Sequence, residues 1–285
     1  MPIISNENNF FCENHFVFLE NEILVKSSAL TNNTGTPLNQ NDLPDDKTLH
    51  KILEAQFASD WFCEPEKNYC AFMLEKDSPL PAGYSTIPLR SFFWKTKSPY
   101  EQENALPCPL GNLASRAHGF LRLRETYIYC PKCGKKLEVS ETLTAKVCPS
   151  CGREDFPRIE PAVIVLVSRN TPGGKEVLLV KSKTSVNKYF SCIAGFIEHG
   201  ETAEETVKRE VLEETGITVK NIRYVGSQAW PFPDQLMLAF RAALAGGEIK
   251  IQEEEIADAA WFKRDSLPET PPPGSVAYNL IFGKF

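Results

Sequence analysis

The chain has 285 residues, of which 42% are apolar and 24% are charged, close to an average globular protein. We therefore expect a folded chain that is long enough to bury a core. The formal net charge is −6, so the chain has no basic excess of the kind that general nucleic-acid binders carry. Its longest purely apolar run, residues 162–167, is far shorter than the ~20 residues of a membrane span.

Residues 1–125 mix short apolar runs with turn-rich polar stretches, and we expect them to form a small N-terminal α/β domain of unknown role. The first residues do not combine a basic start with an apolar stretch, so no signal peptide is predicted. These observations favour a cytoplasmic protein with no membrane association.

Two cysteine pairs share one pattern. Residues 130–134 (CPKCG) and 148–152 (CPSCG) are both C-P-x-C-G turns. The glycine that ends each turn lets the backbone curl, so that both sulfurs point inward. Four thiolates are the tetrahedral ligand set of a closed structural zinc site. The spacing therefore predicts a zinc ribbon at residues 126–157, with these ligands: Cys130, Cys133, Cys148 and Cys151.

The other five cysteines show no pairing pattern. The total of nine is odd, which, without a secretory signal, argues against a disulfide framework and for a reducing compartment. We expect ordinary buried thiols at these five positions: Cys12, Cys63, Cys70, Cys108 and Cys192.

Residues 158–285 alternate strand and helix signals and are expected to form the third domain. Strands are predicted at 162–167, 177–180, 224–227 and 236–244. A helix is predicted from Thr202 to Thr215, because Thr202 and Glu205 form a capping box and Gly216 ends it. A second helix should follow the proline run, with Ser275 as its cap.

The first of these helices is strongly acidic. Glu210 and Glu214 are four residues apart and share one face, with Glu213 beside them. A hard divalent cation such as Mg²⁺ removes the repulsion between such carboxylates, because it prefers oxygen ligands. Arg209 offers a planar fork that can hold one carboxylate in place. On charge alone, a solvated helix face is the alternative interpretation.

The spacing of the charged residues and glycines in this segment resembles the motif of a known family. Residues 195–217 read G-x5-E-x7-R-E-U-x-E-E-x-G-U, with U aliphatic, at every position. This is the Nudix box, and the chain resembles a Nudix hydrolase. The resemblance implies an α+β fold: a Nudix α/β/α sandwich with a mixed sheet, preceded by the ribbon and the N-terminal α/β domain. It also implies hydrolysis of nucleoside diphosphates linked to another moiety, with Mg²⁺ or Mn²⁺ as cofactor.

The same resemblance assigns roles around the box. The positions that match the family's metal ligands and orienting groups are Ala194 (through its carbonyl), Glu201, Arg209, Glu210, Glu213 and Glu214. Glu255 stands six residues before Trp261, where the family has a further acidic ligand or base. For Glu255, the alternative is plain surface charge.

Ten residues past the box, residues 227–237 read SQAWPFPDQLM. Two aromatic rings and two prolines make a stiff platform on which a base can stack; a core-packing loop is the alternative. The segment resembles the S-Q-P-W-P-F-P-x-S signature of the NADH pyrophosphatase branch, with Ala and Gln replacing the first Pro and the last Ser. The substrate-binding residues so implied are Gln228, Ala229, Trp230, Pro231, Phe232, Pro233, Asp234 and Gln235.

Three further positions follow from the resemblance to this branch. Phe156 stands where the family often has tyrosine, and Phe156 and Phe196 are expected to sandwich a nicotinamide or adenine ring. Each of these rings has core packing as its alternative. Ala277 matches a position whose backbone touches substrate.

The resemblance to this branch, the NADH pyrophosphatases and NudC-like NAD-capped RNA hydrolases, implies hydrolysis of NAD(H) to nicotinamide mononucleotide and AMP. It also implies removal of NAD caps from RNA 5′ ends, and a homodimer. Two alternatives stay open. One is a broader hydrolase of ADP-ribose or dinucleoside polyphosphates, and the other is a non-catalytic nucleotide- or RNA-binding module. A Rossmann-type NAD enzyme is disfavoured, because no G-x-G-x-x-G occurs.

Overall fold

A computed structural model describes residues 12–31, 37–96, 110–183 and 189–285. The chain forms two compact units, Met1–Arg158 and Ile159–Phe285. Among the described residues, no helix is long and apolar enough to cross a membrane.

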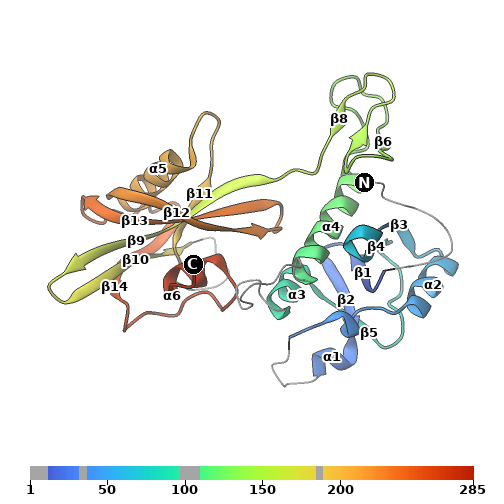
Figure 1. Cartoon of the computed structure of the whole chain (residues 1–285), viewed down its shortest axis with the longest axis horizontal. Coiled ribbons are helices and arrows are strands. Elements are labelled where there is room, and N and C mark those ends of the chain that lie inside the picture. Colours follow the sequence, from blue (N-terminus) through green and yellow to red (C-terminus); the bar gives the residue numbers. More distant parts are fainter. Residues whose placement is uncertain (1–11, 32–36, 97–109, 184–188) are drawn as a thin grey trace. The chain divides into compact units, whose positions relative to one another are not determined.

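A five-stranded sheet organises the first unit, in the order β3-β4-β1-β2-β5 (Figure 1). β1 runs parallel to β4, and the other neighbours are antiparallel. The strands are β1 (Asn14–Leu19), β2 (Glu22–Lys26), β3 (Ala58–Glu64), β4 (Tyr69–Leu74) and β5 (Tyr84–Pro88). The helices are α1 (Ser27–Thr31), α2 (Asp46–Glu54), α3 (Leu89–Lys95) and α4 (Leu110–Thr126), with short 3₁₀ turns η1 (Gln40–Asp42) and η2 (Pro65–Lys67).

Both faces of this sheet are covered, because alternate strand residues point to opposite sides. On one face, Val17 packs with Leu49 and Ile52 of α2. On the other face, Phe18 lies against His118 of α4, with ring centroids 5.1 Å apart. The expected α/β fold of the N-terminal region is therefore confirmed.

The ribbon follows α4 and contains three two-residue strands in the order β6-β7-β8. They are β6 (Glu138–Val139), β7 (Lys146–Val147) and β8 (Glu154–Asp155). The Lys146 Nζ atom donates to the Arg124 carbonyl at 3.0 Å, in the last turn of α4. A cation at a helix C-terminus is stabilised by the helix dipole, so this contact fastens the ribbon to the helix.

The second unit contains a mixed sheet in the order β12-β13-β9-β10-β14, with β11 paired to β9 (Figure 1). β13 and β9 are parallel, whereas the other pairs are antiparallel. The elements are β9 (Glu160–Thr171), β10 (Gly174–Ser182), β11 (Ile193–Phe196), α5 (Ala203–Thr215), β12 (Thr218–Trp230), β13 (Gln235–Gly246), β14 (Ile256–Lys263) and α6 (Val276–Phe282).

The core of this unit explains the long apolar run in β9. Ile164 and Leu166 pack on the side of α6, and Val163 and Val165 pack on the side of α5. A strand that is buried on both faces reads as a continuous apolar stretch. Figure 1 shows the two helices on opposite faces of the sheet. The predicted sandwich with a mixed sheet is confirmed.

Candidate active site

Helix α5 begins and ends where its capping residues predict. The Glu205 N–H donates to Thr202 Oγ1 at 3.3 Å, and the Thr202 N–H donates to Glu205 Oε2 at 2.8 Å. Gly216 ends the helix with a φ of 71°, a conformation that glycine adopts without strain. Val207 and Val211 are fully buried against the sheet, and their burial fixes the rotation of α5 about its axis.

Arg209 connects the acidic groups of this helix. Its Nε and Nη2 atoms donate to the two carboxylate oxygens of Glu201 at 2.6 and 2.9 Å. Nη1 donates to Glu210 Oε1 at 2.8 Å and to Glu213 Oε2 at 3.1 Å. Nη2 also donates to the Phe196 carbonyl on β11 at 2.9 Å. One guanidinium therefore holds three carboxylates and a neighbouring strand in a fixed arrangement.

Glu201 is held as an anion by more than Arg209. Glu201 Oε2 also accepts from the Glu198 N–H at 3.0 Å and from Thr206 Oγ1 at 2.9 Å. The hydrogen bonds from Arg209 first, and then from the Glu198 backbone, lower the pKa of Glu201 to about 2. The role of Thr206 has no signal in the sequence, because Glu201 precedes the helix and no helical periodicity relates the two positions.

Glu210 lies directly against Gly195 of β11. A Cβ atom at residue 195 would overlap the Glu210 carboxylate, so only glycine leaves this space open. Burial raises the pKa of Glu210 despite its bond to Arg209, and the charges of Glu213 and Glu255 act in the same direction.

Glu214 is the most buried acidic residue of this site, with 6% of its surface exposed. Its Oε2 atom accepts no hydrogen bond from any residue that the structure describes. Burial first, and then the charges of Glu210, Glu255 and Glu213, raise the pKa of Glu214 to about 8. Glu255, which is exposed just before β14, is thus close enough to share one electrostatic site with α5.

This arrangement fits a divalent cation. A buried carboxylate oxygen without a partner is costly unless a positive charge or proton satisfies it. Here the charges of Glu210, Glu255 and Glu213 act on the same residue, and carboxylate oxygens are the ligands that hard cations prefer. Ala194, whose carbonyl the sequence analysis adds to the metal shell, precedes Gly195 on the adjacent strand β11.

The four ribbon cysteines form a second candidate metal site. Gly134 and Gly152 both have a φ of 71°, as the two predicted turns require. The Cys133 Sγ atom lies 3.4 Å from that of Cys148, and 3.7 Å separates the Sγ atoms of Cys130 and Cys151. A tetrahedral Zn²⁺ with bonds of ~2.3 Å separates its sulfurs by roughly 3.8 Å, so the cluster fits zinc.

The predicted aromatic platform forms the turn between β12 and β13. Trp230 pairs with Gln235 across the two strands, and residues 231–234 form the turn between them. The ring centroids of Trp230 and Phe232 are 5.2 Å apart and the ring planes meet at 88°, so the edge of one ring packs against the face of the other. Asp234 accepts a hydrogen bond from the Glu160 N–H at 2.7 Å through its carbonyl, which ties the turn to β9.

Gln228 is buried, and its side-chain amide is hydrogen-bonded to the backbone rather than open to a substrate. It is 6% exposed, and its Nε2 atom donates to the Gly274 carbonyl at 2.8 Å. Its Oε1 atom accepts from the Val276 N–H at 2.7 Å. The amide therefore anchors the start of α6, where Ser275 is the N-cap as predicted. Ala277 follows directly and is itself buried.

The two predicted sandwich rings, Phe156 and Phe196, are exposed by 50% and 46% and belong to different units. Large exposed aromatic rings are available for stacking. Their joint role stays a prediction.

The prediction for the remaining cysteines is wrong for two of them. Cys63 and Cys70 form a disulfide between β3 and β4, because antiparallel pairing places them directly opposite each other. Cys12 and Cys192 are buried thiols, as expected. Cys108 lies outside the described residues.

Two family profiles match this chain. The profile of the NUDIX domain matches residues 158–280. The profile of the NADH pyrophosphatase zinc ribbon domain matches residues 125–156.

Several curated proteins that bear the name NAD-capped RNA hydrolase NudC are similar to this chain. The protein of Chromobacterium violaceum is 46% identical over 62% of this chain, and this match spans 65% of the relative's length. The protein of Pseudomonas aeruginosa is 40% identical over 81% of this chain and 76% of its own length. The protein of Deinococcus radiodurans is 38% identical over 74% of this chain and 71% of its own length.

Proposed function

The chain belongs to the Nudix hydrolases that carry an NADH pyrophosphatase zinc ribbon, and we propose that it hydrolyses the pyrophosphate linkage of NAD(H). Water adds across the P–O–P linkage, and the products are nicotinamide mononucleotide and AMP. The observation that carries the proposal is Glu214, a buried carboxylate with an unpartnered oxygen among Glu210, Glu213 and Glu255.

Each residue has a separate task in the proposed reaction. Glu210, Glu213 and Glu214 hold Mg²⁺ or Mn²⁺, together with the Ala194 carbonyl. When bound, the divalent cation neutralises phosphate charge and polarises the attacked phosphorus. Arg209 and Glu201 keep the carboxylates in position through the bonds described above.

A base must take a proton from the attacking water. Glu255 is exposed to solvent, and its charge acts on both Glu210 and Glu214, which supports a place for its carboxylate beside the acidic cluster. We assign this task to Glu255, with a glutamate of α5 as the alternative.

The platform residues 229–235 and Ala277 bind the nucleotide halves, and Gln228 holds the start of α6 in place beside them. The face of Trp230 or Phe232 supplies a stacking surface, which contributes ~1–3 kcal/mol per base in comparable sites. Phe156 and Phe196 each expose a ring that can stack on a nicotinamide or adenine. An RNA that begins with NAD carries the same pyrophosphate linkage, so it is a second substrate, and its cleavage leaves a 5′-monophosphate.

Three further assignments complete the proposal. The four-cysteine cluster of the ribbon holds one structural Zn²⁺, because four thiolates leave no open coordination position for chemistry. The protein works as a homodimer. It acts in the cytoplasm, where the ribbon thiols stay reduced and available to zinc.

A substrate panel tests the proposal. Each substrate is incubated with Mg²⁺ or Mn²⁺, and the products are identified by mass: NADH, NAD⁺, ADP-ribose, a dinucleoside polyphosphate and NAD-capped RNA. We expect kcat/KM for NAD(H) to exceed that for ADP-ribose by about tenfold or more. Glu214→Gln should lower turnover by ~10²-fold or more, whereas Glu204→Gln, on the exposed side of α5, serves as the matched control.

The alternatives give different results in the same panel. Faster cleavage of ADP-ribose or the dinucleoside polyphosphate identifies a broader nucleoside-diphosphate hydrolase. Nucleotide binding without any metal-dependent product identifies a binding module.

A further inference from the structure

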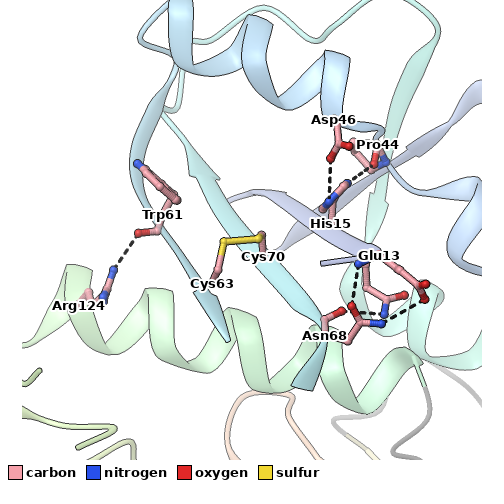
Figure 2. The surroundings of a disulfide bond; sticks show 10 residues. Glu13, His15, Pro44, Asp46, Trp61, Cys63, Asn68, Cys70 and Arg124 are labelled. Atoms are coloured by element: carbon pink, nitrogen blue, oxygen red, sulfur yellow. Dashed lines mark hydrogen bonds and ion pairs between the residues drawn. A yellow bond between two sulfur atoms is a disulfide. The ribbon is translucent and has the colours of Figure 1, made fainter. Parts of the chain in front are cut away.

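The first unit contains three cysteines whose sulfurs lie together. The Sγ atoms of Cys12, Cys63 and Cys70 are all within 4.8 Å of one another. All three residues are buried, and they share one apolar cluster with Leu49 and Ile52 of α2. Figure 2 shows the disulfide between Cys63 and Cys70. Cys12 is a third, free thiol, and its sulfur lies beside this pair.

The register of the sheet brings the bonded pair together. Cys63 on β3 is directly opposite Cys70 on β4. Cys12 lies two residues before β1, the strand on the other side of β4. The three sulfurs therefore come from three successive strands of one sheet or from the residues that lead into them.

A metal site is the other interpretation of three clustered sulfurs, and the neighbouring imidazole argues against it. His15 pairs with Cys70 in the sheet, but its Nδ1 atom lies 3.0 Å from the Pro44 carbonyl. Its Nε2 atom lies 3.3 Å from Asp46 Oδ1. Figure 2 marks both contacts of the ring with dashed lines. Both ring nitrogens are engaged on the side of α2, so this ring does not supply a fourth ligand.

The ribbon offers a direct contrast. Its sulfurs stand 3.4–3.7 Å apart in three pairs, which fits separate thiolates around one ion. In the five-stranded sheet, by contrast, two of the three sulfurs share a covalent bond. The two cysteine clusters of this chain are therefore chemically different.

We propose that Cys12, Cys63 and Cys70 form a thiol–disulfide exchange centre. In the exchange step, the Cys12 thiol loses its proton and its sulfur attacks Sγ of Cys63 or Cys70. The bond between Cys63 and Cys70 breaks as the new bond to Cys12 forms, and the displaced sulfur leaves as a thiolate that takes up the proton. No external oxidant enters this step, because one disulfide and one thiol are present before and after it.

When all three cysteines start as thiols, an oxidant is needed to form the first disulfide. A low-molecular-weight disulfide such as oxidised glutathione has the right chemistry. Two protein thiols become one disulfide, and oxidised glutathione becomes two molecules of glutathione. Cys70 is fully buried, whereas Cys63 is 8% and Cys12 is 5% exposed. The mixed disulfide with glutathione should therefore form at Cys63 or Cys12, and the other cysteines should resolve it.

Burial raises the pKa of the Cys12 thiol, which keeps it largely protonated at neutral pH. Exchange should consequently be slow, so equilibrium populations are the quantity to measure. The full-length, zinc-loaded protein is equilibrated in defined mixtures of reduced and oxidised glutathione. Free thiols are then alkylated under denaturing conditions, and disulfide-linked peptides are identified by mass under non-reducing conditions.

Variants give the decisive result. Cys63→Ser should form a bond between Cys12 and Cys70, and Cys70→Ser should form one between Cys12 and Cys63. Cys12→Ser should keep the original pair. Cys192→Ser is the matched control for loss of a buried thiol elsewhere, and it should also keep the original pair.

Two outcomes overturn the proposal. In the first, circular dichroism shows that Cys63→Ser and Cys70→Ser are folded, but both remaining thiols of the centre stay free. This result counts when the same glutathione mixture forms the Cys63–Cys70 disulfide in the unaltered protein. The second outcome is measured on the unaltered protein, and it decides the question if either variant fails to fold. A measurable fraction of Cys12-linked peptide supports exchange, and its complete absence at equilibrium refutes it.

Discussion

Gly195 and Glu210 occupy complementary space: the missing side chain of the glycine on β11 is the volume that the carboxylate on α5 fills. Gly195→Ala should therefore push the Glu210 carboxylate away from its bond with Arg209. Because a displacement of ~1 Å at a reacting centre can cost ~10²-fold in rate, we expect a loss of turnover of about that size. Steady-state kinetics on NAD(H) and titration with Mn²⁺ would measure it.

Gly173→Ala is the matched control for this change. Gly173 lies in the turn between β9 and β10, and an added Cβ would meet only ordinary contacts there. Equal losses of turnover in the two variants would contradict a specific fit between Gly195 and Glu210.

The raised pKa of Glu214, about 8 against an ordinary value of 4.5, predicts a pH dependence with a definite sign. Between these values, the folded protein without a divalent cation keeps a proton that the unfolded chain has lost. The contribution of Glu214 to the free energy of unfolding therefore falls as the pH rises from about 4.5 to about 8. A cation must displace the same proton, so the affinity for Mn²⁺ should rise with pH by up to about tenfold per unit and level off above pH ~8.

Calorimetric titration with Mn²⁺ at several pH values measures this slope. Glu214→Gln should remove most of it, whereas Glu204→Gln should leave it intact. A flat affinity between about pH 6 and pH 8 in the unaltered protein would show that Glu214 is already ionised.

Zinc removal should unfold the ribbon before it changes the acidic site on α5. Structural zinc contributes ~10–16 kcal/mol in comparable sites, whereas a whole domain is stable by only ~5–15 kcal/mol. A zinc-selective chelator should therefore unfold residues 130–152, seen as faster hydrogen exchange there, before exchange changes in α5. Adding zinc back is the control, and unchanged exchange in the ribbon after verified zinc loss would argue against a structural role.

The parts of the molecule that sequence predicts well are those fixed by local signals. The bounds of α5 follow from Thr202, Glu205 and Gly216, which are neighbours of the helix they delimit. The four-cysteine cluster of the ribbon follows equally from short spacings, because each turn orients its own two sulfurs.

The parts that sequence does not predict depend on how distant segments align. The bond between Cys63 and Cys70 depends on the register of β3 and β4, which a spacing of seven residues does not reveal. The side chain of Gln228 reaches backbone groups that are 46 and 48 residues away in sequence. Its position in a recognisable signature indicates a role at the site, but only the structure shows what the amide contacts.

The two bonds of Gln228 give the last prediction. Because its amide joins β12 to Gly274 and Val276, Gln228→Ala should loosen the start of α6 and with it Ala277. We expect KM for NAD(H) to rise by about tenfold while kcat changes less, since substrate positioning suffers and the acidic cluster stays intact. Hydrogen exchange at residues 274–280 should increase in parallel.

Gln228→Glu separates this anchoring role from direct recognition of substrate. The substituted side chain still accepts from the Val276 N–H, but its carboxylate repels the Gly274 carbonyl, so exchange at residues 274–280 should again increase. A raised KM with unchanged exchange in both variants would instead place Gln228 in direct contact with the nucleotide. In that case its bonds to Gly274 and Val276 would have to open when substrate binds.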